Sequence, residues 1–243
     1  MRQRRVLIGT VLVVVFTLVG CGGQGTPGAS GTTPTGSAAV GTPGAQSDGP
    51  AGGPIGGSST GPSDEPSGDG IGYRVTYPFA VPSSPVTITN PHPPLGTPPA
   101  PALPYLVGVY VGNHPDEDPA YQRISYYFRG GFPSYRFGYV PQVVSDGAGV
   151  PVSLEGNRFL QVVFVDAQAH DDSGASTIAR QPTNPIGMPN LRSFGFAGDF
   201  EGYVSYGLGI QGPAPLPIRA GELTRPDGQG GTFYVVHFDV RTT

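Results

Sequence analysis

Short runs in which hydrophobic and polar residues alternate recur through residues 105–243 of the chain. In the segment 122–129, for example, Ile124, Tyr126 and Phe128 fall on one face of an extended chain, and the residues between them fall on the other. No segment of this part carries the 3.6-residue repeat of a helix, whereas alternation is typical of half-buried strands. The sequence therefore predicts an all-β fold, and more specifically an antiparallel β-sandwich.

We expect about eight strands, separated by turns rich in glycine and proline. The segment 158–165 is a nearly continuous hydrophobic run, which is typical of a central strand buried on both faces. The expected strands cover residues 71–77, 105–111, 122–129, 135–139, 158–165, 191–197, 203–210 and 232–240. The longest irregular connection spans residues 166–189, and loops of that length are often functional or mobile. A site is therefore sought first in this loop.

Glycine and proline are concentrated before this domain. Residues 21–104 hold 18 glycines and 17 prolines in 84 positions, whereas residues 105–243 hold 20 and 12 in 139 positions. Residues 21–70 cannot bury enough hydrophobic surface to offset the entropy of an ordered chain, so we expect a disordered tether there. Such a tether has an average end-to-end distance of about 40 Å. We expect residues 71–104 to be a proline-rich connector with an edge strand at 71–77.

The first 20 residues have the pattern of a secretory signal peptide. Three arginines among the first five residues precede the hydrophobic stretch 6–19, which is shorter than the ~20 residues that span a membrane. The sequence LVGC that ends at Cys21 resembles a bacterial lipobox, in which the cysteine is diacylated. Cys21 is the only cysteine of the chain, so it forms no disulfide within a monomer. We predict a lipoprotein signal peptide over residues 1–20 and an acylated Cys21 that anchors the protein in the lipid bilayer, at the extracytoplasmic face of the bacterial cell membrane.

Composition and spacing argue against several functional classes. The formal net charge of −4 argues against a nucleic-acid partner. No two histidines have the spacing of a zinc-binding helix, and no G-x-S-x-G turn or phosphate-binding loop occurs. Two acidic groups are candidate metal ligands, but the favoured interpretations are a solvated loop and a plain turn. They are Asp166, His170, Asp171 and Asp172 in the first group, and Asn113, Asp116, Glu117 and Asp118 in the second.

Asp199 and Glu201 are a further pair of carboxylates, of the kind that glycosidases use. Both lie in the sequence GDFEG at a turn, and we interpret them as structural or solvated. We therefore predict no catalytic residue, no cofactor and no bound metal, and the protein is not expected to be an enzyme.

Aromatic residues offer a more specific signal. The chain holds 12 tyrosines and 12 phenylalanines, which is more than the core of one small sandwich must use. Exposed tyrosines can stack on sugar rings, and arginines beside them can pair with peptide carboxylates. The alternative is that these residues form the core or cross-strand pairs. The candidate ligand-binding residues are Arg123, Tyr127, Arg129, Tyr135, Arg136, Tyr139 and Tyr203.

Four blocks of sequence occur in order over about residues 110–240: QRISYYFRGGFPSYRFGYVPQVVSDGAGVPVSLEGNRFLQVVF, AQAH, GDFEGYVSYGLGI and YVVHFDV. Together they resemble the AMIN-like domain of bacterial secreted proteins and lipoproteins. The resemblance implies a β-sandwich that acts as a non-catalytic localisation or binding module, as AMIN domains target envelope proteins to peptidoglycan or to envelope machinery. Two functions are therefore expected as alternatives. The domain binds peptidoglycan or another cell-envelope polymer, or it binds another envelope protein at an open sheet edge or through the 166–189 loop.

Overall fold

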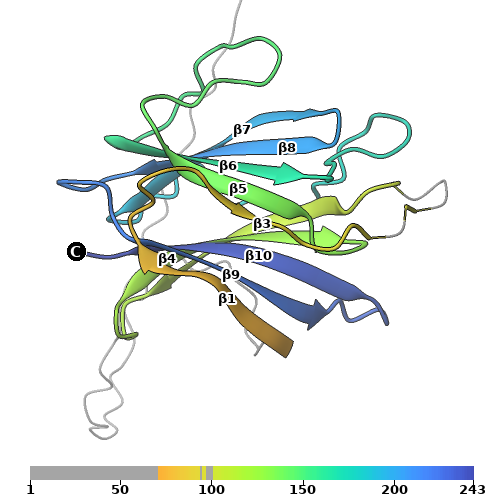
Figure 1. Ribbon diagram of the computed structural model, residues 1–243, viewed down its shortest axis with the longest axis horizontal. Coiled ribbons are helices and arrows are strands. Elements are labelled where there is room, and N and C mark those ends of the chain that lie inside the picture. Colours follow the sequence, from red (N-terminus) through yellow and green to blue (C-terminus); the bar gives the residue numbers. More distant parts are fainter. Residues whose placement is uncertain (1–70, 94, 97–100) are drawn as a thin grey trace, which may run out of the picture. The chain divides into compact units, whose positions relative to one another are not determined.

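The computed structural model describes residues 71–93, 95–96 and 101–243. These residues form ten strands and no helix, arranged as two five-stranded antiparallel sheets that pack face to face (Figure 1). The predicted all-β sandwich is thereby confirmed. No helix in this part of the chain could cross a membrane. The predicted signal peptide, Cys21 and the tether over 21–70 lie outside the described residues.

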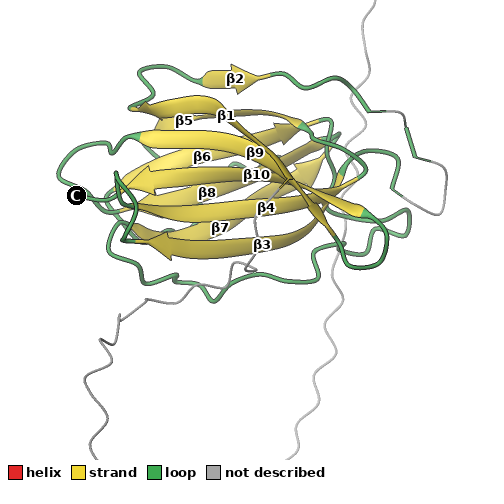
Figure 2. Ribbon diagram, turned by 90° about the horizontal axis from the view of Figure 1, so that it is seen from below, coloured by secondary structure: helices red, strands yellow, loops and turns green. Residues whose placement is uncertain are grey.

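The two sheets have different strand orders. Sheet A runs β1 (Ile71–Ala80), β9 (Ile218–Pro226), β10 (Thr232–Arg241), β4 (Tyr121–Arg129) and β3 (Tyr105–His114). Sheet B runs β2 (Val86–Ile88), β5 (Ser134–Val140), β6 (Arg158–Val165), β8 (Tyr203–Ile210) and β7 (Leu191–Phe200). Figure 2 views the sandwich from the side of sheet A, with the strands of sheet B behind it.

The core lies between the two sheets and is rich in aromatic rings. Tyr126 and Phe128 of β4, Phe164 of β6 and Phe238 of β10 are all fully buried. The ring centroid of Phe164 lies 4.9 Å from those of both Tyr126 and Phe128, in edge-to-face contacts. Burial of one such side chain stabilises a fold by about 1.5–3 kcal/mol. The alternation seen in the sequence therefore identifies the inward face of these strands correctly.

The sandwich includes strands from the segment expected to be a connector. β1 extends to Ala80, past Pro78, and pairs only with β9, so the missing N–H of the proline is tolerated at the sheet edge. β2, which was not expected, pairs with β5 at the edge of sheet B. Sheet A thus begins at Ile71 and sheet B at Val86, and both lie before the predicted domain boundary at Tyr105.

β9 was also not expected, because Gly221, Glu222 and Pro226 interrupt its hydrophobic pattern. The carboxylate of Glu222 is 2% exposed and is compensated by two residues that are distant in sequence. Arg74 of β1 donates a hydrogen bond of 2.5 Å to Glu222 Oε2, and the Asn90 amide donates one of 2.9 Å to Oε1. Such long-range compensation leaves no periodic signal in the sequence.

Candidate functional site

Three of the predicted binding residues lie on the outward face of sheet A and are engaged within the domain. Arg123 is 8% exposed and donates hydrogen bonds of 2.6 and 3.1 Å to the two carboxylate oxygens of Asp239. Arg129 Nη1 lies 2.7 Å from Asp227 Oδ2. Tyr127 is 2% exposed and belongs to a small hydrophobic cluster on this face. The two guanidinium groups are thus neutralised by carboxylates of the same domain.

Two further candidates face the core. Tyr135 is fully buried, and its hydroxyl lies 2.7 Å from Thr76 Oγ1. Tyr139 is half-buried, and its hydroxyl donates to the Leu216 carbonyl at 2.9 Å and accepts from the Leu216 N–H at 3.1 Å. Burial raises the pKa of Tyr139 to about 12, so its hydroxyl keeps its proton at neutral pH. The hydroxyls of both tyrosines are therefore engaged within the domain, and the seven candidates do not form one platform.

The remaining two candidates, Arg136 and Tyr203, meet on the outward face of sheet B. The guanidinium carbon of Arg136 lies 5.9 Å from the ring centroid of Tyr203, and Tyr203 is 41% exposed. Arg136 is opposite Val163, which is in turn opposite Ser205, so these three side chains form a row across β5, β6 and β8. Among the residues that the structure describes, none forms an ion pair with Arg136. Its charge is therefore free to meet a ligand.

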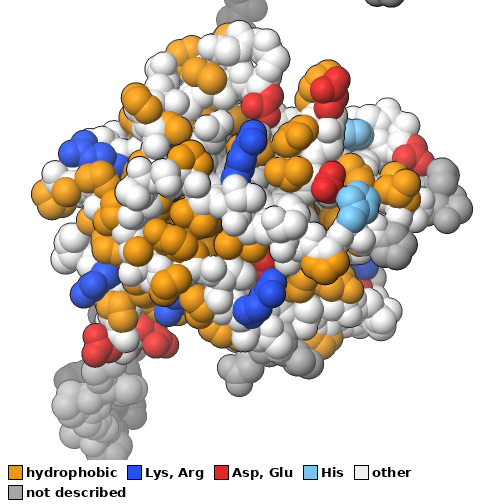
Figure 3. Space-filling model, in the orientation of Figure 1, with side chains coloured by type: hydrophobic (Ala, Val, Ile, Leu, Met, Phe, Trp, Pro, Cys, Tyr) orange, Lys and Arg blue, Asp and Glu red, His pale blue; other side chains and the backbone are white. Residues whose placement is uncertain are grey.

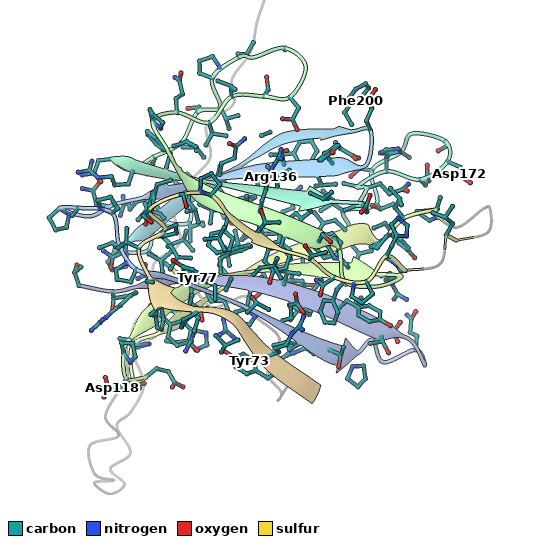
Figure 4. All side chains as sticks on the ribbon, in the orientation of Figure 1. Tyr73, Tyr77, Asp118, Arg136, Asp172 and Phe200 are labelled. Carbon is teal, nitrogen blue, oxygen red and sulfur yellow. The ribbon has the colours of Figure 1, made fainter. Side chains whose placement is uncertain are left out.

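A shallow groove crosses this face of sheet B and contains both residues. One part, of about 200 Å³, is lined by charged, polar and aromatic side chains and one valine: Arg136, Asp146, Gln161, Val163, Phe200, Glu201, Tyr203 and Ser205. A second part, of about 260 Å³, shares Arg136, Gln161 and Val163 and continues past Tyr139 toward Pro85 and Val140. In the orientation of Figure 3, hydrophobic side chains gather over the middle of the molecule with basic side chains among them. Figure 4 labels Arg136 over sheet B and Phe200 at the end of β7.

The loop over residues 141–157 covers the other half of the same face. It arches above sheet B, in green at the top of Figure 1. Glycines in β7 and β8 let it lie directly on the sheet, because a Cβ on Gly207 would lie 2.8 Å from Leu154 Cδ1 and a Cβ on Gly198 would lie 2.5 Å from Asp146 Oδ2. The loop thereby forms a wall of the groove. Because the loop lies over β7 and β8, it leaves the outward side of the central strand β6 only partly covered. The expected burial of β6 on both faces is therefore incomplete.

A tight turn places the two exposed aromatic rings next to each other. Glu201 and Gly202 have φ angles of 51° and 80°, which are typical of a two-residue hairpin turn of type I′. Phe200 and Tyr203 flank this turn and are opposite each other in the β7–β8 pair. Phe200 is 63% exposed. The sequence DFEGY thus places two aromatic side chains, Phe200 and Tyr203, at one end of the groove.

The groove carries unpaired charges of both signs. Asp146 and Glu201 are exposed at the end that holds Phe200, and neither makes an ion pair with a described residue. Arg136 supplies the opposite charge in the same part of the groove. The arrangement therefore fits a ligand with carboxylate and ammonium groups next to a ring or an apolar segment.

Sequence reasoning found Arg136 and Tyr203 but missed Asp146, Gln161 and Phe200 as groove residues. Gln161 carried a usable signal, since it is a polar residue inside a hydrophobic strand. Asp146 carried none, because the position of its loop depends on glycines some 50 residues away. The two predicted acidic groups do not assemble a metal site, as no cluster of three or more histidine, aspartate or glutamate residues that could hold an ion occurs in the described ranges.

The structure is a β-sandwich with a groove on the outward face of sheet B. A family model of the AMIN-like domain matches residues 104–238, which is more than half of the chain. The protein therefore belongs to the AMIN-like domain family, whose domains are extracytoplasmic and associated with peptidoglycan or other envelope partners. No match was found among curated proteins or among solved structures.

Proposed function

We propose that the protein is a membrane-anchored lipoprotein whose AMIN-like domain binds peptidoglycan or another envelope polymer without catalysis, through the groove on sheet B. The observation that carries this proposal is the pairing of Arg136 with Tyr203. An exposed guanidinium that forms no ion pair with any described residue lies over an exposed tyrosine ring, beside the exposed Phe200. A charged group that remains unpaired on a hollowed, aromatic surface is available to a ligand.

The chemistry of the groove suits the peptide part of peptidoglycan. Arg136 can pair with a stem-peptide carboxylate in a bidentate manner, and Asp146 and Glu201 can accept hydrogen bonds from a peptide ammonium group. The rings of Phe200 and Tyr203 offer stacking or apolar contacts for the adjoining part of the polymer. Each of these contacts is modest, but copies of the domain that are anchored in the same membrane would gain avidity for a repetitive polymer.

Acylation of Cys21 is part of the proposal and rests on the sequence alone. A tether over residues 21–70 with an average span of about 40 Å would let the domain reach polymer above the bilayer. Two acyl chains on one residue suffice for stable anchoring. The anchor and the groove then hold membrane and wall material together.

Co-sedimentation with purified cell-wall sacculi tests the binding proposal. The chain from residue 22 onward keeps every strand and lacks the anchor, and it is mixed with sacculi at low salt. We expect the protein in the pellet, and Arg136→Ala and Tyr203→Ala should each weaken retention about tenfold, as for a central contact of an interface. Arg241→Ala, an exposed arginine at the end of β10, is the matched control. A wild-type protein that stays in the supernatant would overturn the proposal.

The alternative is an interaction lipoprotein that binds another envelope protein at a sheet edge. The observation in its favour is β1, an edge strand on which Tyr73 and Val75 are 47% and 45% exposed. Figure 4 labels Tyr73 on β1, at the edge of sheet A. However, Pro78 and three register shifts interrupt β1, and such features discourage strand addition. Soluble protein in the sedimentation experiment would favour this alternative.

A further inference from the structure

A second cavity, of about 300 Å³, lies between β7 and the 166–189 loop. It shares no residue with the groove on sheet B and is lined by Ala169, His170, Gly174, Ser176, Ile178, Gln181, Phe196 and Asp199. Figure 1 shows this loop in teal, projecting beyond the ends of the strands of sheet B, and Figure 4 labels Asp172 in it. The volume is at the small end of the range for ligand pockets, about 300–1,000 Å³, and suits a single ring.

The wall of this cavity is held in place by hydrogen bonds to sheet A. The Leu106 N–H donates to the Gln168 carbonyl and the Val109 N–H donates to the Arg180 carbonyl, both at 2.9 Å. The hydroxyl of Thr177 donates to the Leu106 carbonyl at 2.7 Å. The segment 168–180 therefore runs along the edge of β3 that does not pair with β4. These hydrogen bonds form the wall of the cavity in the absence of a ligand. Preformed sites lose little entropy on binding.

A buried carboxylate orients the histidine of the cavity. Asp199 Oδ2 lies 2.5 Å from His170 Nδ1 and also accepts the Ala169 N–H at 2.9 Å. The other oxygen, Oδ1, is fully buried and makes no hydrogen bond to a described residue, so it is not exposed in the cavity. A carboxylate on one ring nitrogen sets the tautomer of an imidazole and leaves the second nitrogen for a ligand. In His170 that nitrogen is Nε2, on a side chain that is 43% exposed.

The other groups of the cavity are neutral. Ser176 Oγ accepts the Ile178 N–H at 3.2 Å, which leaves its own hydrogen to donate. The Gln181 amide makes no hydrogen bond to any residue in the described ranges. Phe196 is 47% exposed, and its ring is fixed by an edge-to-face contact with Tyr206 at 5.4 Å. A ligand here meets an imidazole nitrogen, a hydroxyl, an amide and an aromatic ring.

We propose that this cavity binds one uncharged sugar ring, stacked on Phe196 and hydrogen-bonded by His170 Nε2, Ser176 and Gln181. Hydroxyl and acetamido groups both donate and accept, as these three side chains do. The lining contains no arginine that could pair with an anionic ligand, and the carboxylate oxygen that has no hydrogen-bond partner, Asp199 Oδ1, is buried out of reach of an ammonium group. The choice of an N-acetylated sugar as probe rests on the proposed function. The groove then contacts peptide while the cavity contacts glycan.

The test is a titration of the chain from residue 22 onward with the trisaccharide of N-acetylglucosamine, followed by NMR. We expect shifts in the His170 imidazole signals and in the amides of residues 169–181 and of β7. Gln181→Ala should weaken binding about threefold and Phe196→Ala about tenfold. Phe196 contacts the core, so the melting temperature of the Phe196→Ala variant is measured in parallel. Gln181 is exposed, so Gln181→Ala tests the cavity without a loss of folding stability. Tyr73→Ala on β1 is the matched aromatic control, since Tyr73 is as exposed as Phe196, and it should bind the trisaccharide as wild type does.

The outcomes separate this inference from the proposed function. No shifts at millimolar trisaccharide, or shifts confined to the groove on sheet B, would overturn the cavity as a sugar site while leaving sacculus binding through Arg136 intact. Shifts at the cavity in a protein whose sacculus binding does not depend on Arg136 would support the cavity and overturn the groove. Equal affinity of Phe196→Ala and wild type would also contradict the stacked geometry.

Discussion

Asp239 of β10 and Arg123 of β4 lie directly opposite each other in sheet A and are joined by hydrogen bonds of 2.6 and 3.1 Å. Arg219 of β9 adds a third hydrogen bond of 2.7 Å to the same carboxylate. Burial acts to raise the pKa of Asp239, but the Arg123 hydrogen bond and the charges of His237, Arg123 and Arg219 hold it below the ordinary value of 3.8. Three strands of the sheet are thus joined through one buried carboxylate.

Replacing Asp239 by asparagine should lower the free energy of unfolding by about 3–5 kcal/mol at pH 7, because it leaves two guanidinium groups without their counter-charge. A lowered pKa in the folded state stabilises the protein above the ordinary pKa, and this contribution is lost as the pH falls through the folded value. The difference between wild type and Asp239→Asn should therefore shrink below about pH 4. Urea unfolding of wild type and Asp239→Asn at pH 7 and pH 3 measures the loss of stability and its decrease at low pH. Asp116→Asn, at an exposed position, is the control, and equal effects of the two changes would contradict the account.

The close approach of the chain to Gly209 should make this position intolerant of any side chain. A Cβ there would lie 1.9 Å from the Glu155 carbonyl oxygen and 2.4 Å from Ser193 Oγ. Gly209→Ala should destabilise the domain by about 3 kcal/mol through overpacking. Gly147→Ala, whose Cβ meets nothing within 4 Å at a φ of 75°, should cost only about 1 kcal/mol for the left-handed backbone. Thermal or urea unfolding of both variants checks the order, and the reverse order would exclude packing as the reason for glycine.

The hydroxyl of Tyr139 should matter for stability and not for binding. Tyr139→Phe removes the partner of both the Leu216 carbonyl and the Leu216 N–H, so we expect a loss of about 1–2 kcal/mol in the free energy of unfolding. Sacculus binding of this variant should equal that of wild type. Tyr203→Phe is the matched control, since Tyr203 is exposed and should unfold as wild type does. Impaired binding by a stably folded Tyr139→Phe would return this residue to the ligand site.

Replacing Cys21 by serine should move the full-length protein from the membrane fraction to the soluble extracytoplasmic fraction, because serine cannot form the thioether to the lipid. Fractionation followed by immunoblotting, together with labelling by a palmitate analogue, measures the change. Continued membrane retention of an unlabelled Cys21→Ser protein would contradict the proposed anchor.

Most of the sheet structure could be predicted from local alternation. β4, β6, β8 and β10 each carry a strand pattern, which alternates in β4 and β10 and is nearly continuous in β6, and all four were expected close to their observed bounds. β9 and β2 could not be predicted in this way. The charge of Glu222 is compensated from β1 and from Asn90, and β2 has only three residues between proline-rich segments.

The site was predictable only in part, and for a related reason. Alternation placed Arg123 and Arg136 correctly on outward faces, but it does not reveal which arginine meets a carboxylate on the next strand. Asp239 is opposite Arg123, whereas Val163 is opposite Arg136. Similarly, His170 and Asp199 meet across 29 positions of sequence, and each was interpreted separately as part of a solvated segment.

Charge reversal at Arg136 is the sharpest test of a binding groove on sheet B. The apparent affinity of the Arg136→Glu chain for purified sacculi is compared with that of wild type and of Arg241→Glu, which has the same change in net charge at the end of β10. We predict that Arg136→Glu weakens binding more than tenfold, since a carboxylate in the groove repels the stem-peptide carboxylates, and that Arg241→Glu binds nearly as wild type does. Equal binding by Arg136→Glu and wild type, or equal losses in the two variants, would contradict a binding groove on sheet B.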